Sequence, residues 1–255
     1  MPAEDQPIIE VRALSAGYAG RVVLRDINFR VRRSEVFLIL GGSGCGKSTL
    51  LKNMIGLYPA LSGEVLIGGK DIVGATGTAR QQILRRFGVM YQSGALFGSM
   101  TLEQNVALPL EEWTHLPVSA RSLLARLKLQ QVGLGAFADY LPSEISGGMQ
   151  KRAAVARAMA LDPAILFLDE PSAGLDPITS AELDELIRSL SRNLGITFVI
   201  ATHELASIYA IGDRAIILDR GSIVAEGVPG DLRDHPSNDY VRAFFRREPE
   251  RARAA

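Results

Sequence analysis

The 255-residue sequence lacks several features that define other classes of protein. It has one cysteine, Cys45, which excludes an internal disulfide and a metal site built from paired cysteines. No purely aliphatic or aromatic run is longer than Val36–Leu40, whereas a membrane span needs about 20 largely apolar residues. The first seven residues are acidic and polar, unlike a secretory signal. We therefore expect a cytoplasmic chain that does not cross a bilayer by itself.

An excess of charge of either sign is also missing. Lys and Arg number 28, as do Asp and Glu, so no global field favours nucleic acid or a lipid surface as a partner. The composition, 47% hydrophobic and 22% charged, is that of an ordinary globular protein. This length is enough for one large domain, or for one domain with a smaller lobe.

Short β-rich runs alternate with helical patterns along most of the chain. Several runs are continuously apolar, which is typical of strands buried on both faces of a parallel sheet. The expected strands are Ile8–Val11, Ile27–Val31, Val36–Leu40, Gly63–Gly69 (running into a glycine turn), Phe87–Tyr91, Ile165–Leu168, Thr197–Ala201, Ala215–Leu218 and Ser222–Ala225.

The stretch from about Thr101 to Ala160 is mostly helical, and it opens with a capping box at Thr101 and Gln104. The expected helices are Lys47–Leu57, Leu102–Leu110, Ser119–Gln131 and Gly147–Leu161. A helical lobe is thus predicted between two strand-rich halves. After Gly230 the chain becomes polar and basic.

A glycine-rich phosphate-binding motif, G-x-x-x-x-G-K-[ST], lies between the apolar strand Val36–Leu40 and a helix. Glycines allow successive backbone N–H groups to converge on phosphate oxygens at the helix N-terminus. Lys47 would reach the β- and γ-phosphates, and the Ser48 hydroxyl would ligate Mg²⁺. The alternative is a glycine-rich turn that caps a helix. The loop comprises Gly41, Gly42, Ser43, Gly44, Cys45, Gly46, Lys47, Ser48 and Thr49.

Two carboxylates follow the buried strand Ile165–Leu168, at the strand end where ligands of open α/β sheets lie. Asp169 would hold Mg²⁺, and Glu170 would orient and polarise an attacking water. An exposed acidic turn is the alternative. Gln92 and His203 each lie just past a strand end, where a polar side chain could reach the γ-phosphate; taken singly, each would be interpreted as a surface residue.

In order, these residues resemble the motifs of the nucleotide-binding subunit of ABC transporters, over residues 8–230. The resemblance implies a P-loop NTPase of ABC type, with a RecA-like α/β core, an antiparallel β portion and an inserted helical subdomain. The implied domains are 1–96 and 161–230 for the core, 97–160 for the helical subdomain with the signature motif, and 231–255 for a C-terminal extension. The matching residues are Tyr18 (stacking on adenine), Gly41–Thr49 (Walker A), Gln92 (Q-loop), Ser146, Gly147 and Gly148 (signature), Asp169 and Glu170 (Walker B), Ser172–Asp176 (D-loop) and His203 (switch histidine).

The resemblance implies ATP hydrolysis with ATP and Mg²⁺. Glu170, His203 and Gln92 would act in catalysis; Ser48, Gln92 and Asp169 would hold the metal. In the family, the signature of one subunit caps the phosphate bound to the opposite subunit, so two identical chains sandwich two ATP molecules. Residues 146–148 would therefore contact nucleotide across this dimer, and Asp176 would also bind nucleotide. Transport would require a separate multispanning permease.

The signature departs from the usual family pattern, because Ile145 and Met149 stand where Leu and Gln are usual. Met149 lacks the amide of a glutamine. Yet Met149, the run from Gln92 to Leu110 and the segment Asp239–Phe245 are similar to the ATPases of MCE-associated (Mla-type) phospholipid transporters. This similarity implies an ATPase at the cytoplasmic face of the bacterial inner membrane, driving phospholipid transport between the inner and outer membranes, with an MCE-domain protein and a small regulatory subunit as further partners.

Two other functions stay open at this level. One is the energiser of a small-molecule ABC importer; the other is a soluble ABC ATPase of the iron–sulfur assembly type.

Four local features each have two interpretations. Cys45 is either a reactive thiol beside a helix N-terminus or a small loop-filling residue. Val241, Phe244 and Phe245 share one helical face, which would dock either on a partner ATPase or on its own domain. Leu96, Phe97 and Met100 would line a groove for the permease or be buried under the helical lobe. Arg246, Arg247, Arg251 and Arg253 would bind lipid headgroups or form a solvated tail.

Overall fold

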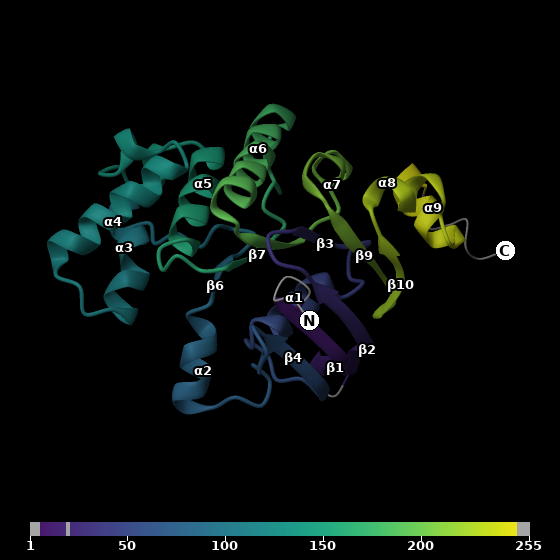
Figure 1. The fold of residues 1–255 in the computed structure, drawn as a ribbon. Coiled ribbons are helices and arrows are strands. Elements are labelled where there is room, and N and C mark those ends of the chain that lie inside the picture. Colours follow the sequence, from purple (N-terminus) through teal and green to yellow (C-terminus); the bar gives the residue numbers. More distant parts are fainter. Residues whose placement is uncertain (1–5, 19–20, 249–255) are drawn as a thin grey trace.

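The computed structural model describes residues 6–18 and 21–248, which form two β-sheets with helices between and around them (Figure 1). The strands are β1 (Ile9–Tyr18), β2 (Arg21–Val31), β3 (Val36–Leu40), β4 (Ser62–Ile67), β5 (Lys70–Asp71), β6 (Phe87–Met90), β7 (Ile165–Asp169), β8 (Thr197–Ala201), β9 (Arg214–Asp219) and β10 (Ser222–Gly227). The α-helices are α1 (Lys47–Met54), α2 (Gly77–Leu84), α3 (Leu102–Trp113), α4 (Val118–Gln131), α5 (Gly147–Ala158), α6 (Pro177–Leu194), α7 (Leu205–Ile211), α8 (Pro229–Asp234) and α9 (Asp239–Arg246).

The larger sheet has six strands in the order β10-β9-β3-β8-β7-β6. Strands β9, β3, β8, β7 and β6 run parallel, and only β10 pairs antiparallel within it. The smaller sheet, β2-β1-β4-β5, is antiparallel throughout. The predicted α/β fold with an antiparallel portion is therefore confirmed. Because the parallel strands share one direction, their carboxyl ends all lie along one edge of the larger sheet.

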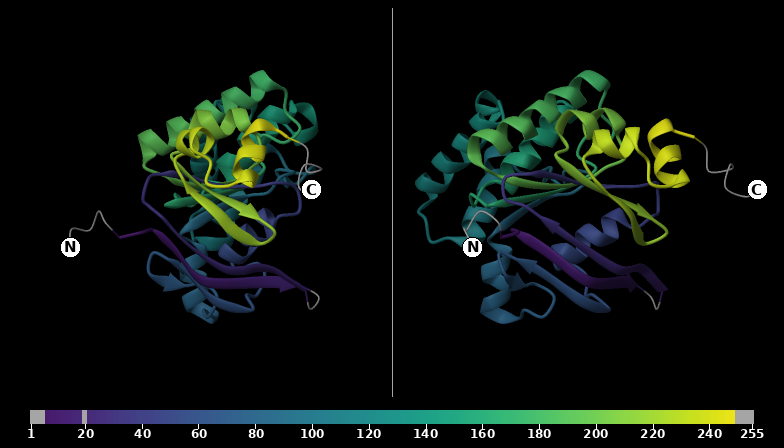
Figure 2. Two further views of the ribbon diagram at one scale, coloured as in Figure 1. Left: turned by 90° about the vertical axis from the view of Figure 1, so that its right-hand side faces the viewer. Right: turned by 45° about the vertical axis from the view of Figure 1, so that its right-hand side comes forward.

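The alternation of side chains along β3 explains why the chain forms layers. Val36, Leu38 and Leu40 belong to one hydrophobic core, which includes residues of helices α3 to α7. Phe37 and Ile39 point to the opposite face and belong to a second core, with α1 and the antiparallel sheet. A strand buried on both faces must be apolar at every position, as this one is. Figures 1 and 2 show α1 between the sheets and α5, α6 and α7 over the other face of the larger sheet.

The predicted helical lobe is formed by α3, α4 and α5 at one end of the larger sheet (Figure 1). The capping box at its start is confirmed, since the Thr101 hydroxyl accepts from the Gln104 amide and the Gln104 side chain accepts from the Thr101 amide. Some ends differ from the prediction: α1 stops at Met54 rather than Leu57, and α5 stops at Ala158 rather than Leu161.

Four helices, α2, α6, α7 and α8, are absent from the sequence-based prediction. The longest of them, α6, carried usable signals. Asp176 caps its first turn, Pro177 occupies the first helical position, and Gly195 ends it in the left-handed conformation with φ +66°. Proline at the start and glycine just past the end are the usual asymmetric marks of a helix.

The C-terminal helix α9 packs on its own domain, beside α8 and α7 at the far end from the helical lobe (Figure 1). Val241 and Phe245 are buried, and Phe244 packs against them from a half-buried position. Of the four arginines considered for headgroup binding, Arg246 lies near Glu248, at 3.8 Å, and Arg251 and Arg253 fall outside the described residues. No helix within residues 6–18 and 21–248 is both long and apolar enough to span a bilayer.

Candidate nucleotide site

The glycine-rich loop lies between β3 and α1, at the carboxyl edge of the larger sheet. Gly41, Gly44 and Gly46 have φ values of +146°, +76° and +112°, in the region that side chains other than glycine rarely adopt. A Cβ on Gly46 would lie 2.7 Å from the Leu24 side chain on β2, so that glycine is also required by packing. The loop conformation therefore depends on glycine at both positions that the motif specifies, 41 and 46, and also at Gly44 between them.

Lys47, the first residue of α1, is buried and turns back over the loop. Its Nζ donates to the carbonyl oxygens of Gly41 at 2.9 Å and Gly42 at 3.2 Å, and it lies 3.7 Å from Oε1 of Glu170. Carbonyl oxygens and a carboxylate thus surround the ammonium group. A phosphate oxygen can replace such partners at little cost, because it is also a strong acceptor.

Ser48 and Asp169 meet although 121 residues separate them. The Ser48 hydroxyl donates to Oδ1 of Asp169 at 3.0 Å, which joins the start of α1 to the end of β7. Burial raises the pKa of Asp169, and the Ser48 hydrogen bond, with Lys52 and Lys47, partly opposes that shift. A hydroxyl and a carboxylate oxygen side by side are the oxygen donors that Mg²⁺ prefers.

Glu170 has an unusual backbone and an incomplete set of partners. Its φ is +47°, rare for a residue other than glycine, and its amide donates to the Ala201 carbonyl on β8 at 2.8 Å. Oε1 lies 2.8 Å from Nδ1 of His203, while Oε2 is buried without a hydrogen-bond partner. A strained backbone and an unpaired buried oxygen cost stability, and such features concentrate at functional sites.

Gln92 follows β6 and is exposed at the same edge. Its side chain and that of Asp169 line one open pocket of about 580 Å³, with Lys52 and Gly174 also on its walls. Lys151 of α5 donates to the Gln92 carbonyl, and burial lowers the pKa of this lysine. The structure therefore brings Gln92, Ser48, Asp169, Glu170, Lys47 and His203 to one edge of the sheet.

Lys52 belongs to this edge but was missed by the sequence analysis. It lies four residues after Ser48 on α1, hence on the same helical face, and it helps to hold the pKa of Asp169 down. That i, i+4 spacing after the motif was the available signal.

The signature residues lie elsewhere, at the N-terminus of α5. The exposed Ser146 caps this helix by accepting from the Met149 amide at 3.3 Å, and no hydrogen bond or ion pair in the described chain links it to the glycine-rich loop. Gly147 is exposed and Gly148 buried; a Cβ on Gly148 would lie 2.2 Å from Cγ2 of Thr179 on α6. Gly148 thus has a packing role that the sequence analysis did not anticipate.

Asp176 and Tyr18 are also apart from the loop. Asp176 caps α6, accepting from the amides of Ile178 and Thr179 at 3.0 and 3.1 Å, and hydrogen bonds from the Thr179 side chain and backbone lower its pKa. Tyr18 ends β1 with 59% of its surface exposed, so its ring is available for stacking. Ser43 and Gly44 are exposed at the loop tip, and Thr49 is half-buried on α1.

The structure bears on two features that had two interpretations each: the role of Cys45 and the burial of the segment after Gln92. Cys45 is buried, and burial raises the pKa of its thiol, which favours the role of a small loop-filling residue over that of a reactive thiolate. In the segment after Gln92, Leu96 packs against the core, whereas Phe97 is 50% exposed. Leu96 therefore fits burial under the helical lobe, whereas Phe97 fits a surface that a partner could contact.

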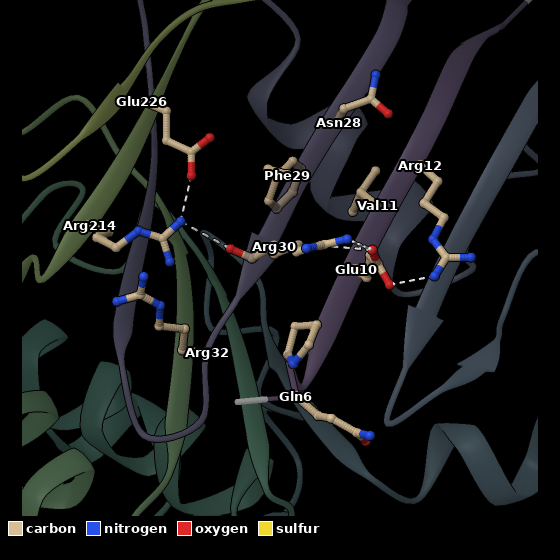
Figure 3. Close-up of a pocket in the computed structure, with 11 residues that line it drawn as sticks. Gln6, Glu10, Val11, Arg12, Asn28, Phe29, Arg30, Arg32, Arg214 and Glu226 are labelled. Atoms are coloured by element: carbon tan, nitrogen blue, oxygen red, sulfur yellow. Dashed lines mark hydrogen bonds and ion pairs between the residues drawn. The ribbon is translucent and has the colours of Figure 1, made fainter. Parts of the chain in front are cut away.

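A larger pocket of about 630 Å³ lies on the open face of β1 and β2, beside β9 and β10 (Figure 3). Five of its charged side chains form ion pairs: Glu10 contacts Arg12 and Arg30, and Glu226 contacts Arg214. The Arg12 hydrogen bond contributes most to lowering the pKa of Glu10. None of the residues around this pocket is a predicted site residue. The lining residues are Gln6, Pro7, Glu10, Val11, Arg12, Asn28, Phe29, Arg30, Arg32, Arg214 and Glu226.

Known proteins similar to this chain include several ATP-binding subunits of transport systems. The family model described as "ABC transporter" matches residues 24–173, and a model described as "AAA domain, putative AbiEii toxin, Type IV TA system" matches residues 140–208. The "Intermembrane phospholipid transport system ATP-binding protein MlaF" of Haemophilus influenzae is 36% identical over 94% of this chain and 99% of its own length. The "Probable ribonucleotide transport ATP-binding protein mkl" of Mycobacterium leprae is 41% identical over 93% of this chain and 68% of its own.

Solved structures of ATP-binding cassettes also resemble this chain. The dimeric post-hydrolysis structure of the ATP-binding cassette MJ0796, bound to ADP and Pi, superposes with a TM-score of 0.78 and 29% identity, over 86% of this chain and 98% of that one. The cbiO1 structure from Clostridium perfringens gives a TM-score of 0.83 and 30% identity, over 91% and 92%. The chain therefore belongs to the ABC transporter family, as an ATP-binding subunit that hydrolyses ATP.

Proposed function

We propose that this chain is the ATPase subunit of a system that moves phospholipid between the inner and outer membranes of a bacterium. The observation that carries the proposal is its alignment with the Haemophilus MlaF protein, which spans 94% of this chain and 99% of that protein. Met149 and the run from Gln92 to Leu110 support it, because they are similar to the sequences of the same subgroup.

The chemistry proposed for the site uses residues already close together. Residues 41–49 bind the triphosphate of ATP, with Lys47 exchanging its carbonyl partners for phosphate oxygens. Ser48, Asp169 and Gln92 would hold Mg²⁺, which when bound neutralises phosphate charge. Glu170 orients and deprotonates the attacking water, and its unpaired Oε2 is available for that hydrogen bond. His203, bonded to Oε1, fixes the orientation of this carboxylate.

We further propose that the working unit is a homodimer in which each site is shared. Ser146, Gly147 and Gly148 of one copy would cap the γ-phosphate held by the other copy, with Asp176 beside them and Tyr18 stacking on adenine. This assignment accounts for an exposed signature helix N-terminus that has no hydrogen bond or ion pair to its own loop among the described residues. It is supported by MJ0796, a cassette of the same fold that is dimeric with ADP and Pi.

The proposed organisation follows the sequence prediction. Residues 1–96 and 161–230 would form the RecA-like core with its antiparallel portion, 97–160 the helical subdomain, and 231–255 the C-terminal extension. The dimer would be peripheral on the cytoplasmic face of the inner membrane, with a separate permease, an MCE-domain protein and a small regulatory subunit.

Affinity purification of this chain from its own cells tests the transport assignment. Co-purification of a multispanning permease together with an MCE-domain protein is the expected result. A substrate-binding protein in place of the MCE protein would indicate a small-molecule importer. The 36% identity to the "Methionine import ATP-binding protein MetN" of Caulobacter vibrioides supports this second candidate. Soluble scaffold proteins in place of any permease would contradict transport altogether. The Lys47→Ala variant is the matched control, because it separates partners that bind in every nucleotide state from those that need ATP.

A further inference from the structure

The C-terminal helix α9 reaches the glycine-rich loop. One face of α9 is packed against its own domain: Val241 and Phe245 are buried, and the Phe245 ring stacks on Tyr209 with 6.0 Å between the ring centroids. Its cap residue, Asn238, accepts from the Val241 amide at 3.0 Å and donates to the Val224 carbonyl on β10 at 3.2 Å. The helix is thus held against β10 and α7, which leaves the side chain of Tyr240 in a fixed place.

The Tyr240 hydroxyl joins two parts of the nucleotide edge. It accepts from the Gly42 amide at 3.0 Å and donates to the Leu218 carbonyl, near the end of β9, at 3.2 Å. The loop is tightly packed at this point, because a Cβ on Gly41 would lie 2.5 Å from the Leu218 oxygen and 2.6 Å from the Cys45 sulfur. Tyr240 is 198 residues from Gly42, so this contact depends on tertiary packing.

The peptide unit between Gly41 and Gly42 is held at both poles. Its carbonyl oxygen accepts from Lys47 Nζ at 2.9 Å, and its N–H donates to Tyr240 at 3.0 Å. These two groups point in opposite directions in a trans peptide, so the lysine and the tyrosine hold the same plane from either side. Two hydrogen bonds on one peptide also polarise each other, which strengthens both.

We propose that Tyr240 is a positioning residue for ATP binding: by holding the Gly41–Gly42 peptide it keeps the glycine-rich loop in its phosphate-binding conformation, and it couples the C-terminal segment to the nucleotide site. This inference rests on the proposed role of residues 41–49 in phosphate binding. Without the tyrosine hydroxyl, the peptide is restrained from one side, and the loop populates its binding conformation for a smaller fraction of the time. Apparent affinity falls in proportion to that fraction.

The Tyr240→Phe variant tests this proposal, because it keeps the ring and removes the hydroxyl. We expect the KM and Kd for ATP to rise about fivefold, the usual effect of losing one well-made hydrogen bond, with kcat within about twofold of the wild type. Tyr209→Phe is the matched control. It removes the hydroxyl of a ring that lies 5.0 Å from Cζ of Arg233, under the same helix but away from the loop, and should leave KM unchanged.

A second measurement needs no nucleotide. The buried Cys45 lies inside the loop and is the chain's one cysteine, so its rate of alkylation by iodoacetamide reports loop opening. Tyr240→Phe should raise that rate about threefold or more, whereas Tyr209→Phe should not.

Unchanged alkylation and unchanged KM in Tyr240→Phe would overturn the proposal, as would equal changes in both variants. A failure of the phosphate-loop assignment is distinct from either result: it would appear as ATP binding that Lys47→Ala leaves intact.

Discussion

The glycine-rich edge and the signature helix carry the same kinds of residue but differ in their partners. At the edge, Glu170 contacts both Lys47 and His203, and Ser48 contacts Asp169, so that three separate segments of the chain meet. At the N-terminus of α5, the hydrogen bonds of Ser146 to other described residues stay within its own helix, and Gly147 is exposed. One region is assembled within a single copy of the chain, whereas the other presents helix amides outward.

This contrast explains why the first region stores strain and the second does not. Glu170 combines a φ of +47° with a buried oxygen that has no partner, and Asp169 is ionisable in a buried position. Ser146 and Asp176 are instead ordinary helix caps with extended backbones and satisfied side chains. Chemistry is therefore expected at the first region and recognition at the second, and the following changes test that division.

The largest effect is expected from Glu170→Gln at the assembled edge. The amide keeps the shape and the contact with His203 but cannot take a proton, so kcat should fall by about 10²–10⁴-fold. ATP should still bind, and the variant should accumulate as an ATP-bound dimer. Phosphate release and size-exclusion chromatography measure the two effects.

Glu64→Gln on β4 is the control for this substitution, because that glutamate is exposed and pairs only loosely with Arg12, at 3.6 Å. It should hydrolyse ATP like the wild type. Near wild-type hydrolysis by Glu170→Gln itself would show that Glu170 is not the base.

Mixing two inactive variants tests whether one active site combines the phosphate loop of one copy with the signature of the other. Lys47→Ala disables the phosphate loop, and Ser146→Arg places a bulky cation at the signature; each alone should hydrolyse little ATP. In a mixed dimer one site has both an intact loop and an intact signature. Because half of the dimers in an equal mixture are mixed, up to roughly a quarter of the wild-type rate should return.

Steady-state hydrolysis at several mixing ratios measures this recovery. A rate equal to the mean of the two separate variants at every ratio would contradict a site shared between copies. A mixture of Lys47→Ala with Glu170→Gln is the control, since both defects lie in the same region and no mixed dimer gains an intact site.

The assembled edge was predictable from the sequence because its parts are local. Each residue follows an apolar run that must be a strand, and the carboxyl ends of neighbouring parallel strands meet at one edge. That reasoning predicts Asp169 and His203 at the same edge as the phosphate loop. In the structure Asp169 meets Ser48, and His203 lies beside Glu170, a pairing that the sequence did not predict. Their roles in hydrolysis stay a prediction.

Contacts that depend on packing between distant segments could not be predicted. The Tyr240 hydroxyl meets Gly42 because α9 is anchored by Phe245, and no local pattern encodes that distance. The close approach of Gly148 to Thr179 likewise follows from how α5 crosses α6. Helix α6 itself was missed despite its proline and glycine signals.

Gly148→Ala tests whether the glycine in the signature is required by packing. Its close contact with Thr179 explains this glycine as well as phosphate binding does. The new Cβ would lie 2.2 Å from Thr179 Cγ2, and overpacking of this kind costs about 1–3 kcal/mol. Chemical denaturation without nucleotide measures the loss. Thr179→Ser removes the clashing methyl and keeps the hydroxyl bonded to Asp176, so the double variant should regain most of the stability.

Gly147→Ala is the matched control one residue earlier. Its nearest contact would be 3.9 Å away, so stability should be unchanged or rise by about 0.5–1 kcal/mol, the gain from replacing glycine in a helix. Equal losses at both positions would contradict the packing explanation.

The smallest effects, and the most direct contrast, concern two aspartates with pKa values shifted in opposite directions. Burial raises the pKa of Asp169 above its ordinary value of 3.8, so the cost of its ionisation to folding grows as the pH rises from 3.8 to the raised value and is constant above it. Asp169→Asn should therefore be more stable than the wild type at neutral pH without nucleotide, at the low end of the roughly 0.5–2 kcal/mol typical of stabilising changes. The gain should shrink as the pH falls toward 3.8, because protonation of Asp169 then removes the charge that burial disfavours.

Asp176 should behave in the opposite way. Hydrogen bonds from Thr179 lower its pKa, so its contribution is present above the unfolded value and is lost as the pH falls through the folded one. Asp176→Asn should therefore be slightly less stable than the wild type at neutral pH, with the difference vanishing in acid. Urea denaturation at pH 4.5, 6 and 7.5 compares the two variants. Stability should rise on neutralisation only for a carboxylate whose burial outweighs its hydrogen bonds. If both variants changed stability in the same direction at neutral pH, the assembled edge would not store more strain than the signature region.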